Sequence, residues 1–147
     1  MTHEVYMREA MKEAEQAVAA GNAPFGVVVV DSTTGDIIAR DHDRVTELCD
    51  PTAHGEINII RRLCKQLETL SLPHTIFYTT SEPCPTCFTA LIKAKVPKIY
   101  YGAETEATAS LPIKARDLAA QSKKHPIEVT GGILGDECLE QRQRLSA

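Results

Sequence analysis

Two short stretches of this sequence decide which fold and which site the chain can form: TAHGEINII at residues 52–60 and EPCPTC at residues 82–87. Each places metal-ligating side chains where a helix is expected to begin after a loop or a strand. In the first stretch, His54 and Glu56 are two residues apart, a spacing at which side chains do not share a lateral helix face. We therefore expect both to point past the N-terminal end of their helix, into one pocket.

The second stretch supplies two thiols. Cys84 and Cys87 have the C-x-x-C spacing of a metal chelate or a redox pair, and Pro85 suits the first helical position. Both thiols then lie on the first turn, where the helix dipole favours thiolate. With His54 they predict one Zn²⁺ held by three protein ligands, with the fourth tetrahedral position open as in catalytic sites. Glu56 beside it would act as general acid and base, which completes the H-x-E and P-C-x-x-C signature of zinc deaminases.

Each of these features also has a plain structural explanation. C-x-x-C occurs in thioredoxin-like redox sites, His54 could cap its helix, and Glu56 could pair with Arg61 or Arg62. The two stretches nevertheless occur together and in order, each at an expected helix start, and this context favours the zinc site. The three remaining cysteines are assigned to core or loop packing: Cys49, Cys64 and Cys138.

The length, net charge and cysteine content of the chain indicate its domain number, its partners and its cellular compartment. Its 147 residues predict a single domain over residues 1–147. A net charge of −4 disfavours tight binding of nucleic acid without excluding it. No apolar run is long enough to span a membrane, and the charged N-terminus lacks the pattern of a secretion signal. With an odd number of scattered cysteines, we expect a cytoplasmic protein with reduced thiols and no membrane contact.

Helical and strand patterns alternate along the chain, with residues 41–52 expected to form a loop. Leu67 and Leu70 are expected to face inward near the end of their helix. Strands that are apolar on both sides and alternate with helices favour an α/β sheet covered on both faces. Helices are expected over residues 6–20, 53–70, 85–94, 111–121 and 135–145, and strands over residues 25–31, 37–40, 75–80, 98–102 and 127–130.

On these residues the chain resembles the cytidine deaminase-like superfamily over nearly its whole length. Residues 50–57 and 81–87 resemble the zinc motifs of guanine deaminases and tRNA adenosine deaminases. GNAPFGVVVV at 21–30 resembles a strand entry of guanine deaminases, FYTT at 77–80 is similar to fungal-type cytosine deaminases, and IEVTGGILGDEC at 127–138 resembles the closing segment of the tRNA enzymes. The resemblance implies a three-layer α-β-α fold with a five-stranded mixed sheet, one Zn²⁺ per chain and a homodimer.

The resemblance also implies which residues bind substrate. The amide of Gly55 and the carbonyl of Glu82 match positions that contact the ring or the leaving amine, and Phe25 matches a pocket wall, although core packing explains Phe25 equally well. Relatives carry Asn eleven residues before the zinc-binding His, where this chain has Asp43. An ionised Asp only accepts hydrogen bonds, whereas Asn also donates. Asp43 would therefore suit a ring edge rich in N–H donors, unless it is merely a loop residue.

The favoured function is hydrolytic deamination of a free nucleobase or a related amino-substituted heterocycle (guanine-, cytosine- or triazine/pterin-like), with release of ammonia. The alternative of tRNA-specific adenosine deamination ranks second, because residues 137–147 carry only two Arg against two Glu. The third alternative is a non-catalytic, zinc-binding partner subunit. The presence of Glu56 disfavours it.

Overall fold

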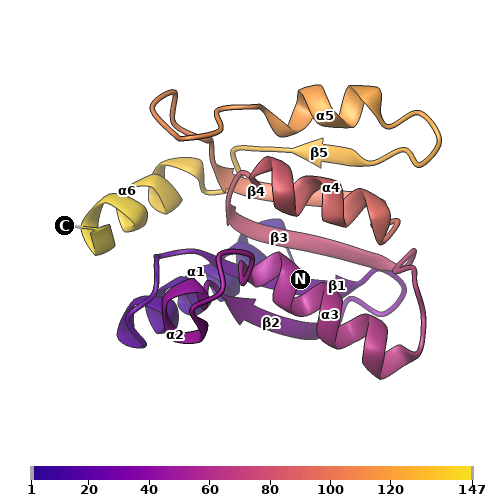
Figure 1. Cartoon of the computed structure of the whole chain (residues 1–147), viewed down its shortest axis with the longest axis horizontal. Coiled ribbons are helices and arrows are strands. Elements are labelled where there is room, and N and C mark those ends of the chain that lie inside the picture. Colours follow the sequence, from indigo (N-terminus) through magenta and orange to yellow (C-terminus); the bar gives the residue numbers. More distant parts are fainter. Residues whose placement is uncertain (1, 147) are drawn as a thin grey trace.

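The computed structural model describes residues 2–146, which form one five-stranded sheet with helices on both faces (Figure 1). Strands lie in the order β2-β1-β3-β4-β5; β1 is antiparallel to β2 and β3, whereas β3, β4 and β5 are parallel. The expected five-stranded mixed sheet is confirmed. In chain order the elements are α1 (His3–Ala19), β1 (Gly26–Asp31), β2 (Ile37–His42), α2 (Val45–Leu48), α3 (Gly55–Leu67), β3 (Thr75–Ser81), α4 (Pro85–Lys93), β4 (Lys98–Ala103), α5 (Ala115–Gln121), β5 (Glu128–Thr130) and α6 (Gly135–Ser146).

Alternation along the buried strand β1 divides the core into two halves, because successive side chains of a strand point to opposite faces. Val27 and Val29 pack on the side of α3 and α4, together with Ile59 and Phe88. Val28 and Val30 pack on the opposite side, against residues of α1 and α6. Figure 1 shows α3 and α4 in front of the sheet and α1 behind it. The expected three-layer α-β-α arrangement is therefore confirmed.

The sheet topology determines where the two sequence motifs meet. Because β2 and β3 are both antiparallel to β1, they run in the same direction and end at the same edge of the sheet. The chain leaves β2 through α2 and a short loop and then begins α3, and it leaves β3 through three residues and then begins α4. The N-terminal ends of α3 and α4 consequently lie side by side at this edge (Figure 1).

Four details differ from the expectations. The helix α3 ends at Leu67 because Glu68 adopts a left-handed conformation, with φ of 51°. Leu67 and Leu70 are 55% and 91% exposed, so the prediction that they face inward is wrong. The short helix α2 lies within the expected loop. The helix α5 begins at Ala115 rather than residue 111, and the backbone N–H of Ala115 donates to the carboxylate of Glu82 in the connection between β3 and α4.

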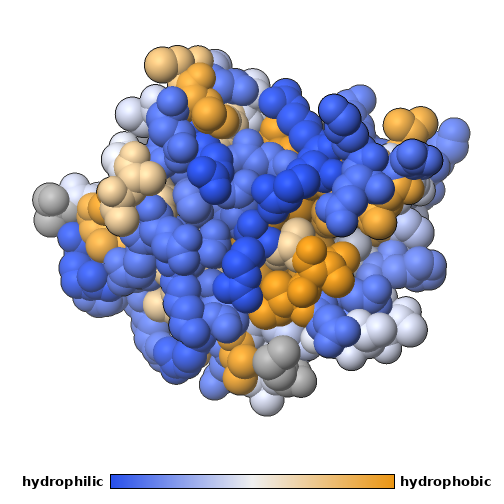
Figure 2. Space-filling model, turned by 90° about the horizontal axis from the view of Figure 1, so that it is seen from below, coloured by the Kyte–Doolittle hydropathy of each residue, from blue (hydrophilic) through white to orange (hydrophobic). Residues whose placement is uncertain are grey.

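The surface is largely hydrophilic. Within residues 2–146, no helix combines the length and the apolar character needed to cross a membrane. Figure 2 shows a face that is mostly hydrophilic, with a local group of hydrophobic residues. The large apolar side chains that are exposed are Val5, Ile38, Leu48, Leu67, Leu70, Leu111 and Ile113.

Candidate zinc and catalytic site

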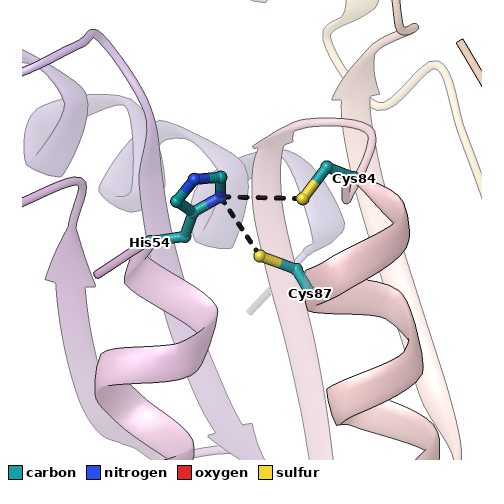
Figure 3. Close-up of side chains that lie close together, drawn as sticks. All are labelled: His54, Cys84 and Cys87. Atoms are coloured by element: carbon teal, nitrogen blue, oxygen red, sulfur yellow. Dashed lines mark hydrogen bonds between the residues drawn. The ribbon is translucent and has the colours of Figure 1, made fainter. Parts of the chain in front are cut away.

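The His and the two Cys come together between the starts of α3 and α4 (Figure 3). His54 and Cys84 are the N-cap residues of these helices, both in extended conformation, and neither side chain caps its own helix. The Nδ1 atom of His54 lies 3.7 Å from Sγ of Cys84 and 3.3 Å from Sγ of Cys87. The alternative in which His54 serves as a helix cap is therefore excluded, and its ring faces both thiols.

These distances fit a tetrahedral zinc ion. Zn–S bonds of about 2.3 Å and Zn–N bonds of about 2.0–2.1 Å at a tetrahedral angle separate nitrogen and sulfur by roughly 3.6 Å. The observed separations of 3.3 and 3.7 Å bracket that value, and all three ligand atoms lie within 4.8 Å of one another. Because one imidazole and two thiols supply only three ligands, the donor set is that of an open site and not of a closed structural one.

The protonation of the ligands is strongly coupled. Hydrogen bonding to Cys84 raises the pKa of His54 to about 9. Hydrogen bonds with Cys87 and His54 lower the pKa of Cys84 to about 4, and the hydrogen bond to Cys84 together with burial raises the pKa of Cys87. A cation that binds here would need neutral imidazole and both thiolates, so its binding releases protons.

Glu56 is buried on the inner side of α3, with 7% of its surface exposed. Burial raises the pKa of its carboxyl to about 7, the range that suits a group exchanging protons near neutral pH. Arg61 pairs with Asp50 and Arg62 with Asp41, and no ion pair of Glu56 with either arginine is found in residues 2–146. The explanation of Glu56 as a structural ion-pair partner is therefore wrong.

A cavity of about 90 Å³ opens beside these groups. A water-sized sphere takes roughly 10–15 Å³, so the cavity has the size for a heterocyclic base with its substituents rather than for a whole nucleotide. Of the eight residues predicted for the site, all but Cys87 line it. The lining comprises Phe25, Gly26, Asp43, His54, Gly55, Glu56, Thr79, Thr80, Ser81, Glu82 and Cys84.

Sequence reasoning missed four lining residues, Gly26 and the run Thr79–Ser81. They lie within segments that carry the family resemblance but have no metal-ligating or proton-transferring side chain, and the pairing of β1 with β3 brings them to the cavity. A strand end beside a C-x-x-C segment is a weak signal that could have pointed to Ser81. The γ-hydroxyl of Thr80 accepts a hydrogen bond from the backbone N–H of Gly26, at 3.1 Å, which joins the two strands at the cavity wall.

Asp43 and Phe25 line the cavity from neighbouring backbone segments. The backbone N–H of Asp43 donates to the carbonyl of Phe25 at 3.0 Å, so the two positions are held together. Asp43 is 4% exposed and lines the cavity, the placement that a substrate-contacting role requires. Phe25 is half-buried and lines the cavity at its mouth, rather than belonging to either core cluster.

The side chain of Glu82 has a structural role that the sequence did not indicate. Its carboxylate accepts hydrogen bonds from the backbone N–H groups of Thr105 and Ala115, at 2.8 and 2.7 Å, and pairs with Lys114 at 3.4 Å. Burial alone would raise the pKa of Glu82, but these donors outweigh it and hold the pKa below its ordinary value. Glu82 therefore anchors residues 105–115 beside the cavity.

A three-layer sheet fold with a His-Cys-Cys donor set, an open ligand position and an adjacent buried carboxylate defines a zinc-dependent deaminase domain. The comparison with known families agrees. The chain belongs to the family described as the cytidine and deoxycytidylate deaminase zinc-binding region, whose model matches residues 1–103.

Individual relatives act on two kinds of substrate. The tRNA-specific adenosine deaminase of Bacillus subtilis (strain 168) is 38% identical over 136 residues, which cover 92% of this chain and 83% of that protein. The guanine deaminase of the same organism is 42% identical over 105 residues, covering 71% of this chain and 66% of that protein. A solved structure from a study of A-to-I editing by tRNA:A34 deaminases at the wobble position of transfer RNA superimposes with a TM-score of 0.81 at 34% identity, covering 92% of this chain and 97% of that one.

Proposed function

We propose that this chain catalyses the hydrolytic deamination of an amino-substituted purine or similar ring bound in the cavity. The observation that carries the proposal is the buried carboxylate of Glu56, which shares a cavity with the His54 and Cys84 ligand atoms. An uncompensated buried carboxylate is costly, and a proton-transfer role beside a cation accounts for its retention.

The roles of the residues follow from their positions. His54, Cys84 and Cys87 would hold Zn²⁺, which when bound supplies the Lewis acidity that activates water. Glu56 would take a proton from the attacking water and deliver it to a ring nitrogen, and would then transfer the proton of the newly formed hydroxyl to the leaving amine. Water thereby adds to the carbon that bears the amine, the C–N bond breaks, and the products are the oxo ring and ammonia. The backbone of Gly55 and Glu82 and the ring of Phe25 would orient the substrate.

The proposal is tested with Glu56→Gln, which keeps the size of the side chain and removes its ability to transfer protons. We expect ammonia release to fall by at least about 10²-fold while bound zinc, measured by atomic absorption, is retained. Glu68→Gln is the matched control, because Glu68 is an exposed residue at the opposite end of the same helix. Equal ammonia release by Glu56→Gln and wild type would contradict the mechanism and support a non-catalytic role.

Adenosine in tRNA is the substrate that the comparisons favour, although composition ranked it second. The tRNA-specific relative matches 92% of the chain, and the structure from the tRNA:A34 deaminase study matches the same share. The test is deamination of an anticodon stem-loop with adenosine at the first anticodon position. An electrostatically bound RNA would also lose affinity steeply as salt is raised.

A free base such as guanine is the second candidate, supported by the guanine deaminase relative and by the groove outside the cavity. This groove of about 390 Å³ is lined by Glu82, Glu106 and Arg142 among others. Arg142 pairs with Glu106 at 3.4 Å, and Lys114 pairs with Glu82 and Glu104. Since these cations are already compensated by carboxylates, the groove offers an RNA backbone little net positive charge.

We also propose, from the family resemblance, that the chain forms a homodimer in the cytoplasm. The group of hydrophobic residues on the face in Figure 2 supports self-association, because exposed apolar patches often mark interfaces. Light scattering on the zinc-loaded protein measures the assembly mass directly, and a mass of one chain at micromolar concentration would contradict the dimer.

A further inference from the structure

Asp43 places a carboxylate in the cavity with only part of its hydrogen-bonding capacity used. It follows the end of β2, and its Oδ1 atom accepts a hydrogen bond from the backbone N–H of Val45 at 3.0 Å. No hydrogen bond to its second oxygen is found within residues 2–146. The residue is nonetheless 4% exposed, so this second acceptor is largely removed from bulk solvent.

No lysine or arginine of the described residues pairs with Asp43. No Lys or Arg lines the cavity in the part of the chain that the structure describes. Arg44 is the sequence neighbour of Asp43, but its guanidinium pairs with Asp41 at 2.8 Å and Glu47 at 3.3 Å. Arg62 likewise pairs with Asp41. The acceptor on Asp43 is therefore left for whatever the cavity binds.

We propose that Asp43 selects substrates whose ring presents an N–H donor to it, in addition to the amine that leaves. This inference rests on the proposed deaminase function and specifies its substrate class. An ionised carboxylate can only accept hydrogen bonds, so a ring carbonyl or an unprotonated ring nitrogen facing Asp43 meets a second acceptor. A site built to bind a donor rejects an analogue that lacks it, because the buried polar groups are then left unpaired.

The size of the cavity indicates that the donor belongs to the ring. At about 90 Å³ it has the size for a heterocyclic base with its substituents, and Asp43 lines it together with Glu56 and His54. The substrate class is then an amino-oxo or diamino heterocycle. Adenine, by contrast, has the acceptors N1 and N7 on either side of its leaving amine and no donor at C2, and the ring N–H on its imidazole part is shared with 2,6-diaminopurine.

The experiment compares wild type with Asp43→Asn on two free bases that share the same leaving amine, adenine and 2,6-diaminopurine. Asn preserves the acceptor for the Val45 N–H, so folding is expected to survive. We expect wild type to prefer 2,6-diaminopurine by at least about tenfold in kcat/KM, and Asp43→Asn to reduce this ratio toward one. A ratio that is unchanged within threefold in Asp43→Asn would overturn the selection by Asp43.

Two further measurements separate this inference from the proposed function. Binding of the same two bases to Glu56→Gln and to the double variant with Asp43→Asn, measured by calorimetry, reports the preference without turnover. Tighter binding of 2,6-diaminopurine by Glu56→Gln, and its loss in the double variant, would support the role of Asp43 even if no ammonia were released. The absence of ammonia release would then contradict only the deaminase proposal. Asp50→Asn is the control, because Asp50 lies in the same loop, outside the cavity, and bonds Thr52. A loss of preference in Asp50→Asn equal to that in Asp43→Asn would contradict the inference.

Discussion

The carboxylate of Glu82 offers a sharp test of how the cavity is held together. Its two oxygens accept from two different backbone N–H groups, those of Thr105 and Ala115. In Glu82→Gln, one of these N–H groups would face the amide nitrogen, which is itself a donor, and Lys114 would lose its buried partner. The variant therefore keeps the shape of the side chain and breaks its hydrogen-bond pattern.

The expected loss in the free energy of unfolding follows from the number of hydrogen bonds affected. One unsatisfied buried N–H costs about 1–3 kcal/mol, and the loss of a charged acceptor weakens the remaining bonds, so we expect a loss of about 2–4 kcal/mol in the free energy of unfolding. With a urea m-value of about 2 kcal/mol per molar, the middle of its usual range, the unfolding midpoint falls by about 1–2 M. Glu104→Gln is the matched control, because Glu104 also pairs with Lys114 but its side chain is 59% exposed. Its expected loss is below about 0.5 kcal/mol.

The loss of stability in Glu82→Gln also depends on pH, and its direction follows from the lowered pKa of Glu82. The folded pKa of Glu82 lies below its ordinary value of 4.5, so its contribution to stability is present above that pH and disappears as the pH falls through the folded pKa. The difference between wild type and Glu82→Gln should therefore be largest at neutral pH and shrink in acid. Urea unfolding of the zinc-loaded proteins, followed by circular dichroism at pH 7 and pH 4, measures both effects. Equal midpoints for Glu82→Gln and Glu104→Gln at pH 7, or a difference that grows in acid, would refute the reasoning.

Two other predictions concern the metal and the core. Cys87→Ala should lose bound zinc on dialysis, measured by atomic absorption. Cys49→Ala should retain zinc, because Cys49 is exposed and outside the ligand set. Equal zinc content in the two variants would contradict the assignment of Cys87 as a ligand. Phe88→Ala should lower the free energy of unfolding by about 3–5 kcal/mol because Phe88 is fully buried between α4 and the sheet. Leu70→Ala, at a side chain that is 91% exposed, should change it by less than about 0.5 kcal/mol, and a comparable loss there would show that Leu70 is covered in solution.

Local sequence patterns were enough to predict the zinc ligands and the adjacent carboxylate. The C-x-x-C spacing with Pro85 and the H-x-E spacing depend on residues within one helical turn, and the structure brings His54, Cys84 and Cys87 within ligand distance as expected. The end of α3 was harder to locate, because the apolar spacing runs on to Leu70. Only the left-handed turn at Glu68 ends the helix and turns the last leucines outward.

What the sequence by itself determined is the chemistry: the ligand types, the adjacent carboxylate and the alternation of strands and helices all follow from near neighbours in the chain. The tertiary structure decided which distant segments share the cavity. Thr79 and Gly26 reach it because β1 and β3 are paired, and Glu82 anchors residues 105–115 across more than twenty positions of sequence. Such contacts depend on strand order and direction, which no local spacing encodes. For the same reason, the open acceptor of Asp43 could be suspected from the sequence but only the fold shows which wall of the cavity it occupies.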